Sequence, residues 1–413
     1  MPAFLTHWRV LIETAKRSQD AGNDLGSLII DASALRRRAL GWSTPPQTPP
    51  AGAVWDTGPL PAIDFSFPGS DISAMAYLGA SAPDITSYQR GNFRKKISDY
   101  RQRNRPYLQP ADGGDRRWAD LLHFNRSGDI LLTFLEMIAH IPSPALRSQA
   151  LAFAMGYLSH IATDIALNPC INVLAGAYDK RAIPGLFAPL GPHFYVELCL
   201  DEYVASTYFN RPRYRWTRQP WGQYIESAAA GCAIPGTLSA QVLDLLTDAS
   251  QATYGLTEEQ SKNFHQDYLD GLQRLRNYLA GRGTFRLLTF SALSRRRKDD
   301  PIIAGIAEQS HEPGTLDFEK VIAYAIRLSE HLCRRAIAYY AALRNTSATA
   351  SERNQRRTAL CEDLRNWNLD SGYAMDVTFD EQVTLHILHN WVHFARLWES
   401  EMEAMAQAQS LGR

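Results

Sequence analysis

The stretch Gly156-Tyr157-Leu158-Ser159-His160-Ile161-Ala162-Thr163-Asp164 lies within an apolar pattern of helical period that runs through residues 145–168. Apolar residues at i, i+3, i+4 and i+7 predict a helix with a buried face. Because His160 and Asp164 are four residues apart, this helix presents an imidazole and a carboxylate on one face. Both side chains can reach one divalent ion. A buried histidine paired with an aspartate in a helical core is the other interpretation.

A second pair has the same spacing. In His193-Phe194-Tyr195-Val196-Glu197 an imidazole and a carboxylate again stand four residues apart. Two such pairs so close in the sequence favour a metal centre over a core ion pair.

The helical period recurs along most of the chain and predicts an all-α, multi-helical protein. The best strand candidate, 284–291, is short, and the Pro- and Gly-rich residues 43–70 predict a long loop. A polar joint around 209–236 indicates a ligand-bearing core over 1–208 and a helical region over 209–413 packed on that core. The other predicted helices are 7–22, 117–140, 192–208, 238–249, 257–281, 316–344 and 379–408.

The composition is that of a soluble globular protein. Of the 413 residues 45% are hydrophobic, and the formal net charge of zero gives no reason to expect a nucleic-acid partner. The five cysteines form no CxxC motif, which predicts reduced, mostly buried thiols. With no signal peptide and no long apolar run, we expect no transmembrane segment and a cytoplasmic protein, with export without a cleaved signal as the alternative. Basic clusters near 94–105 and 295–298 are expected to be solvated, with peripheral membrane contact as the alternative.

Three further side chains in the first half are candidate ligands. His7 stands near the start of the first predicted helix, and His123 stands near another. Asp84 follows Pro83, which could project the carboxylate from a turn or let it cap a helix. His123 could equally be a core or surface histidine. Together with the two pairs, these residues make four histidines and three carboxylates, enough for two or three divalent ions.

Three histidines, His386, His389 and His393, form one stripe of the last predicted helix. A second metal site or a phosphate-binding wall is one interpretation. Packing and hydrogen bonding between helices is the other, because large apolar residues surround them.

The motifs of the first half, taken in order, resemble the zinc-dependent phospholipase C family, a relative of the zinc nucleases that cleave single strands. The resemblance covers about residues 1–205 and rests on Thr6-His7, Leu78-Gly79-Ala80 with Pro83-Asp84-Ile85, His123-Phe124-Asn125 with Ser127-Gly128-Asp129, Gly156–Asp164 and His193–Glu197. It implies a mostly helical fold that holds three zinc ions.

The resemblance also implies a ligand set. The first zinc would be bound by Asp84, His123, His160 and Asp164. Asp164 would bridge to a second zinc held by His7 and the N-terminal residue, which is Pro2 if the initiator Met1 is removed. The third zinc would be bound by His193 and Glu197.

One position departs from the family pattern. Asn168 stands where the family has a further histidine for the third zinc, and Cys170 could supply a thiolate instead. A structural, buried Cys170 is the alternative.

The implied activity is zinc-dependent hydrolysis of a small-molecule or lipid phosphate ester, of the phospholipase C type, by a metal-activated hydroxide. Asp84 would be a ligand or the base that orients the attacking water. The alternatives are a repurposed or non-hydrolytic zinc protein of the same fold, which Asn168 favours, and a nuclease, against which the neutral charge stands.

Overall fold

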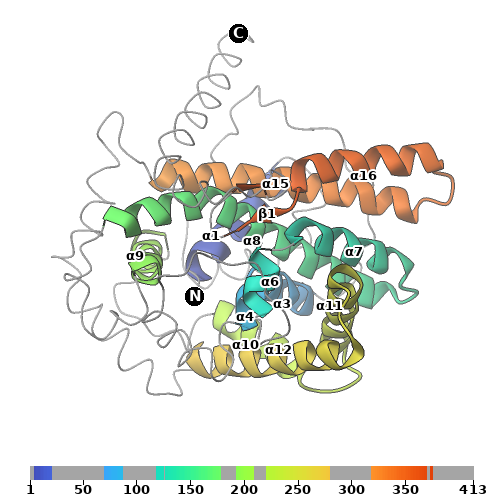
Figure 1. Ribbon diagram of the computed structural model, residues 1–413, viewed down its shortest axis with the longest axis horizontal. Helices are drawn as coiled ribbons and strands as arrows, with labels where there is room; N and C mark the ends of the chain where they lie inside the picture. The colour runs from blue at the N-terminus through green and yellow to red at the C-terminus, as the bar shows by residue number, and fades with distance from the viewer. Residues whose placement is uncertain are drawn as a thin grey trace, which may run out of the picture.

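The helix predicted around His160 is the central helix of the fold. In the computed structural model it is α8, Pro144–Ala177, and helices α1, α3, α7, α9, α11 and α15 pack around it (Figure 1). Tyr157, Leu158 and Ile161 are fully buried. A helix that is apolar on every side needs partners on every side, and α8 has them. By length and composition Pro144–Asn168 could also span a membrane, but every residue of its most apolar stretch is buried inside the protein.

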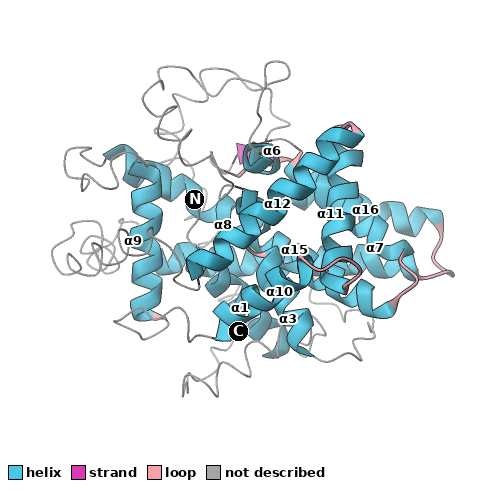
Figure 2. Cartoon of the chain, turned by 90° about the horizontal axis from the view of Figure 1, so that it is seen from below, coloured by secondary structure: helices cyan, strands magenta, loops and turns pink. Residues whose placement is uncertain are grey.

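The structure describes residues 4–20, 69–86, 118–124, 126–177, 192–208, 220–279, 318–369 and 373–374. This part of the chain is all-α, as predicted, apart from a two-residue antiparallel pairing of β1 with β2 (Figure 2). Besides α8, the elements are α1 Phe4–Asp20, α3 Gly69–Gly79, α4 Ala82–Ile85, α6 Trp118–Phe124, α7 Ser127–His140, α9 Pro192–Thr207, α10 Pro220–Cys232, α11 Leu238–Tyr254, α12 Glu258–Leu279, α15 Phe318–Arg344, α16 Ala350–Leu364, β1 Trp367–Asn368 and β2 Tyr373–Ala374.

Four details of the sequence interpretation were wrong. Helix α3 begins inside the predicted loop, and α10 occupies the predicted polar joint. Helix α16 was not predicted at all. The single helix expected over 117–140 is two helices, because Arg126 adopts a left-handed conformation with φ 51° between them. The strand candidate 284–291 and the helix 379–408 lie outside the described residues.

The crossing of α3 and α8 depends on two glycines. A Cβ atom on Gly156 would lie 2.0 Å from the carbonyl oxygen of Ala76, and one on Gly79 would lie 2.0 Å from that of Phe153. Only glycine permits so close an approach of two backbones. The crossing brings the end of α3, and the short helix α4 that follows it, against the face of α8 that carries His160.

Helices from the second half of the chain share this core. Helix α15 packs along α8 and α1, and α10 and α12 lie beneath α3 and α4. Arg9 of α1 forms a two-pronged ion pair with Glu319 of α15, with 2.8 Å between one Nη and one Oε. Cys199, Cys232 and Cys333 are buried, as predicted.

Candidate metal centre

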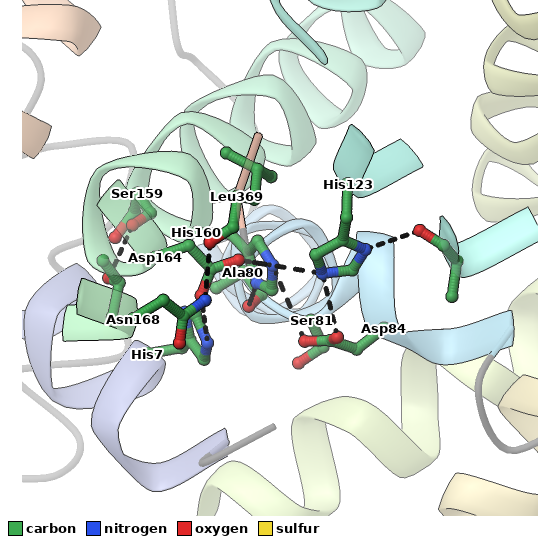
Figure 3. A network of polar contacts seen from close by, with 12 residues as sticks. His7, Ala80, Ser81, Asp84, His123, Ser159, His160, Asp164, Asn168 and Leu369 are labelled. Atoms are coloured by element: carbon green, nitrogen blue, oxygen red, sulfur yellow. Dashed lines mark hydrogen bonds and ion pairs between the residues drawn. The ribbon is translucent and has the colours of Figure 1, made fainter. Parts of the chain in front are cut away.

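His160 stands on α8 with its two ring nitrogens in different surroundings. Its Nδ1 lies 3.0 Å from the carbonyl oxygen of Ala80 at the end of α3 (Figure 3). A carbonyl can only accept, so the proton lies on Nδ1. The Nε2 atom then faces the carboxylates, 3.0 Å from Asp164 Oδ2 and 3.6 Å from Asp84 Oδ2.

His123, at the end of α6, is oriented in the same way. Its Nδ1 donates to the carbonyl oxygen of Ala119 one turn earlier, at 2.6 Å. Its Nε2 lies 3.2 Å from Asp84 Oδ1 and 3.7 Å from Asp164 Oδ2. A hydrogen bond from one ring nitrogen to a carbonyl, with the other nitrogen turned to a ligand cluster, is the usual arrangement of metal-binding histidines.

The distances suit shared metal ions. Atoms bound at zinc-like distances of about 2.0–2.2 Å around a tetrahedral centre lie about 3.3–3.6 Å from one another. The nitrogen-to-oxygen distances between the two imidazoles and the two carboxylates run from 3.0 to 3.7 Å, with Asp84 turning Oδ1 to His123 and Oδ2 to His160. Two groups that share His160 have ligand atoms close enough to hold a metal ion: Asp84 with His123 and His160, and His7 with His160 and Asp164.

His7 extends the cluster on the side of α1. Its Nε2 lies 3.3 Å from Asp164 Oδ1, and its ring stacks on that of His160 with 4.1 Å between centroids. The two oxygens of Asp164 thus face different histidines, with Oδ1 toward His7 and Oδ2 toward His160 and His123. A carboxylate placed in this way can serve two adjacent ions.

Burial and charge set the protonation of the cluster. Burial and the neighbouring His160 lower the pKa of His7 well below its usual value. Burial alone would raise the pKa of Asp84, but the His160 and His123 rings outweigh it, so the pKa is lowered. For Asp164, burial prevails and raises the pKa. Burial would lower the pKa of His160, but the carboxylates of Asp164 and Asp84 outweigh it and raise that pKa. The neutral His7 and ionised Asp84 are forms that bind metals, whereas a metal at His160 and Asp164 would have to displace protons.

Several candidate ligand atoms make no well-aligned hydrogen bond to any described residue, although His160 Nε2 and Asp164 Oδ2 lie 3.0 Å apart. These buried atoms are His160 Nε2, His7 Nδ1, Asp84 Oδ2 and Asp164 Oδ2. A buried polar atom left without a partner costs about 1–3 kcal/mol, and more when it is charged. A cation among them would satisfy Nε2 of His160 and both carboxylate oxygens at once.

The structure brings together five of the seven predicted ligands, and they come from α1, α4, α6 and α8. Glu197 is buried on α9 but does not belong to either group of ligand atoms close enough to share an ion. The side chains of His193 and Cys170 lie outside the described residues, as do Pro2 and the histidine stripe His386, His389 and His393. Asn168 is buried, and its amide nitrogen donates to the carbonyl oxygen of Leu369 at 2.6 Å.

Asp201 was not among the site residues predicted from the sequence. From α9, its Oδ1 accepts the backbone N–H and the hydroxyl of Thr6, each at 3.1 Å. Burial raises the pKa of Asp201 well above its ordinary value, although these donors from the first turn of α1 act in the opposite direction. Asp201 therefore anchors the start of the helix that carries His7. A helix N-terminus does attract a carboxylate, but a partner so distant in the chain leaves no local signal.

No protein-family model, curated protein or solved structure matches this chain. The assignment of a function therefore depends on the residues of the cluster.

Proposed function

We propose that the protein is a zinc-dependent hydrolase of phosphate esters, of the phospholipase C type. The observation that carries the proposal is the buried cluster of Asp84, His123, His160 and Asp164, whose nitrogen-to-oxygen distances of 3.0 to 3.7 Å suit atoms that share metal ions. A buried mixture of imidazole and carboxylate ligands suits zinc. The motif order that resembles zinc-dependent phospholipases C supports the same chemistry.

When bound, zinc lowers the pKa of a coordinated water to about 7 and neutralises the oxygens of a phosphate ester. In the hydrolysis, water adds to phosphorus, the bond from phosphorus to the ester oxygen breaks, and the alcohol leaves with a proton. The protein's part is to hold the ligands rigidly. The carbonyl groups of Ala80 and Ala119 fix the two rings, and the α3–α8 crossing fixes Asp84.

Both oxygens of Asp84 face imidazoles, at 3.2 Å from His123 and 3.6 Å from His160. This arrangement favours the ligand role of Asp84 over that of a base that orients water, since neither oxygen is turned away from the rings. The side chains of Asp84, Asp164 and His123 keep 7 to 9% of their surface exposed, whereas His160 has none. A substrate would therefore meet the cluster from the side of the first three.

The test is metal content followed by turnover. Protein purified without chelators would be analysed by elemental mass spectrometry. It would then be assayed with bis(p-nitrophenyl) phosphate, p-nitrophenyl phosphorylcholine and phosphatidylcholine vesicles. We expect at least one zinc per chain, and Asp164→Asn should lower turnover by at least about 100-fold, since even residues behind the ligands are worth about 10- to 100-fold. The matched control is Asp270→Asn. It removes a carboxylate that forms a partly exposed ion pair with Arg274 on α12, and it should leave turnover unchanged.

A non-hydrolytic protein that keeps a metal for stability is the second candidate. It is favoured by Asn168, whose amide nitrogen is bonded to Leu369, and by Glu197, which lies outside both ligand groups among the described residues. Zinc-loaded protein that hydrolyses none of the three substrates, but unfolds at a lower temperature in chelator, would favour this candidate over the hydrolase.

A further inference from the structure

The segment 365–369, here called the strap, comes from the second half of the chain and lies against the metal cluster. It follows α16 and includes β1. Its last residue, Leu369, is fully buried and is hydrogen-bonded to Asn168 next to the cluster (Figure 3). None of its side chains belongs to the ligand set.

The strap is bonded to the start of α7 by its first residues. The side-chain oxygen of Asn366 accepts the backbone N–H groups of Gly128 and Asp129, each at 3.1 Å. Because Arg126, the residue before α7, provides no side-chain cap, Asn366 acts as the cap from a distant part of the chain. Ser127 exchanges two further hydrogen bonds with the backbone of the strap, at 2.7 and 2.9 Å.

The strap and α7 touch at strained residues. Arg126 and Arg365 are the two non-glycine residues with positive φ in the described part of the chain, at 51° and 41°. A Cβ atom on Gly128 would lie 1.8 Å from the carbonyl oxygen of Arg365. Such conformations cost about 1–3 kcal/mol each and persist where the surrounding structure holds them.

The strap ends by joining two ligand-bearing helices through one residue. The N–H of Leu369 donates to the carbonyl oxygen of His123 at 2.8 Å. The carbonyl oxygen of Leu369 accepts the amide N–H of Asn168 at 2.6 Å. His123 is itself a ligand on α6, and Asn168 lies one turn beyond Asp164 on α8. The backbone N–H and C=O of a single residue therefore link the two helices.

We propose that the strap positions His123 relative to Asp164, and that Asn168 is the positioning residue that connects the strap to α8. The inference rests on the proposed metal centre. Asn168, in the place of an expected third-site ligand, would then serve the first ion indirectly. The affinity of the first ion depends on a segment about 200 residues distant in the chain, as the 201-residue separation of Asn168 and Leu369 indicates.

Two variants test the strap without changing a ligand. Asn168→Leu keeps the size of the side chain and removes the donor. Gly128→Ala improves helix propensity in α7 but places a methyl group against Arg365, so it should displace the strap. The matched control is Ser250→Ala, which removes a buried hydroxyl bonded within α11 at 2.8 Å. Zinc affinity would be measured by competition with a chromophoric chelator, and the cobalt-loaded proteins by visible absorption.

We expect about 10- to 100-fold weaker zinc binding in both strap variants, the range seen when groups behind metal ligands are removed. Their cobalt spectra should also change. The control, Ser250→Ala, should bind zinc like the wild type, even if it loses as much thermal stability as the strap variants. Wild-type affinity and spectra in both strap variants would overturn the proposal and leave the proposed hydrolase intact. Amide hydrogen exchange over 118–124 in chelator gives a second readout that needs no metal. Faster exchange in the strap variants, but not in the control, would support the proposed role of the strap. It would do so even if the wild type bound no zinc, a result that would reject only the proposed function. Unchanged exchange in the strap variants would overturn the proposed role of the strap.

Discussion

The substitution Gly156→Ala tests whether the α3–α8 crossing builds the site. The new Cβ atom would lie 2.0 Å from the carbonyl oxygen of Ala76, and ordinary van der Waals contact begins at 3.4 Å. The two backbones must therefore separate locally by about 1.4 Å. Overpacking of this kind costs about 1–3 kcal/mol of stability.

The same displacement acts on the site. The hydrogen bond from His160 to the Ala80 carbonyl is 3.0 Å long, so a shift of this size would break it and release the ring. The loss of such a bond behind a metal ligand should weaken zinc binding by about 10- to 100-fold. Chelator competition measures the affinity, and thermal unfolding in chelator measures the stability separately.

Gly236→Ala is the matched control, because a Cβ atom there meets nothing within 4 Å, although its φ of 83° strains any side chain. It should cost about 1 kcal/mol of stability without changing zinc affinity. If Gly156→Ala binds zinc like the wild type, the crossing does not set the position of His160 and the reasoning fails.

Three further predictions concern groups outside the ligand set. Asp201→Ala should release Thr6 and weaken the binding of a second ion beside His7 by about 10-fold, whereas Asp201→Asn, which keeps an acceptor, should weaken it less; stoichiometric zinc titration distinguishes the two. Burial would raise the pKa of Glu319, but its bonds to Arg9 lower it below the ordinary value of 4.5. Because Glu319 is 41% exposed, the pair contributes only about 1 kcal/mol. The stability difference from Glu319→Gln should therefore be present above pH 4.5 and disappear as the pH falls through the lowered pKa, as measured by urea unfolding of both proteins in chelator. Thr349→Ala, which removes the cap of α16, should cost about 1 kcal/mol and leave zinc affinity unchanged.

The sequence predicted most of the longer helices, including α8, which is apolar on every side, and missed α3, α10 and α16. Helix α3 has only 11 residues, mostly apolar or small, and it follows directly on a Pro-rich stretch, so its pattern was too short to stand out. Helix α16 buries only Leu360 and Leu364, and two buried residues are too few to produce a helical period. Its start did carry a signal, since Thr349 accepts the backbone N–H of Glu352 at 3.1 Å, the spacing of a helix cap.

The candidate ligands were visible because helical spacing fixes which side chains share a face. His160 and Asp164 needed only the period of one helix. That His123 and Asp84 join them depends on how α3, α4 and α6 pack on α8, which spacing does not give. The carbonyl groups that orient the rings leave no mark on the sequence, because every residue carries one.

The strap illustrates why the contacts of the second half of the chain with the cluster could not be predicted. The strap contacts the cluster through the backbone of Leu369, which bonds to the carbonyl oxygen of His123 and to the side-chain amide of Asn168. The residue type of Asn168 had suggested only a missing ligand. A division of the chain after residue 208 would separate Asn168 from Leu369 and Arg9 from Glu319. These contacts join α8 and α1, the two helices that carry His160 and His7, to later parts of the chain. The candidate ligands on these helices would therefore lose both supports.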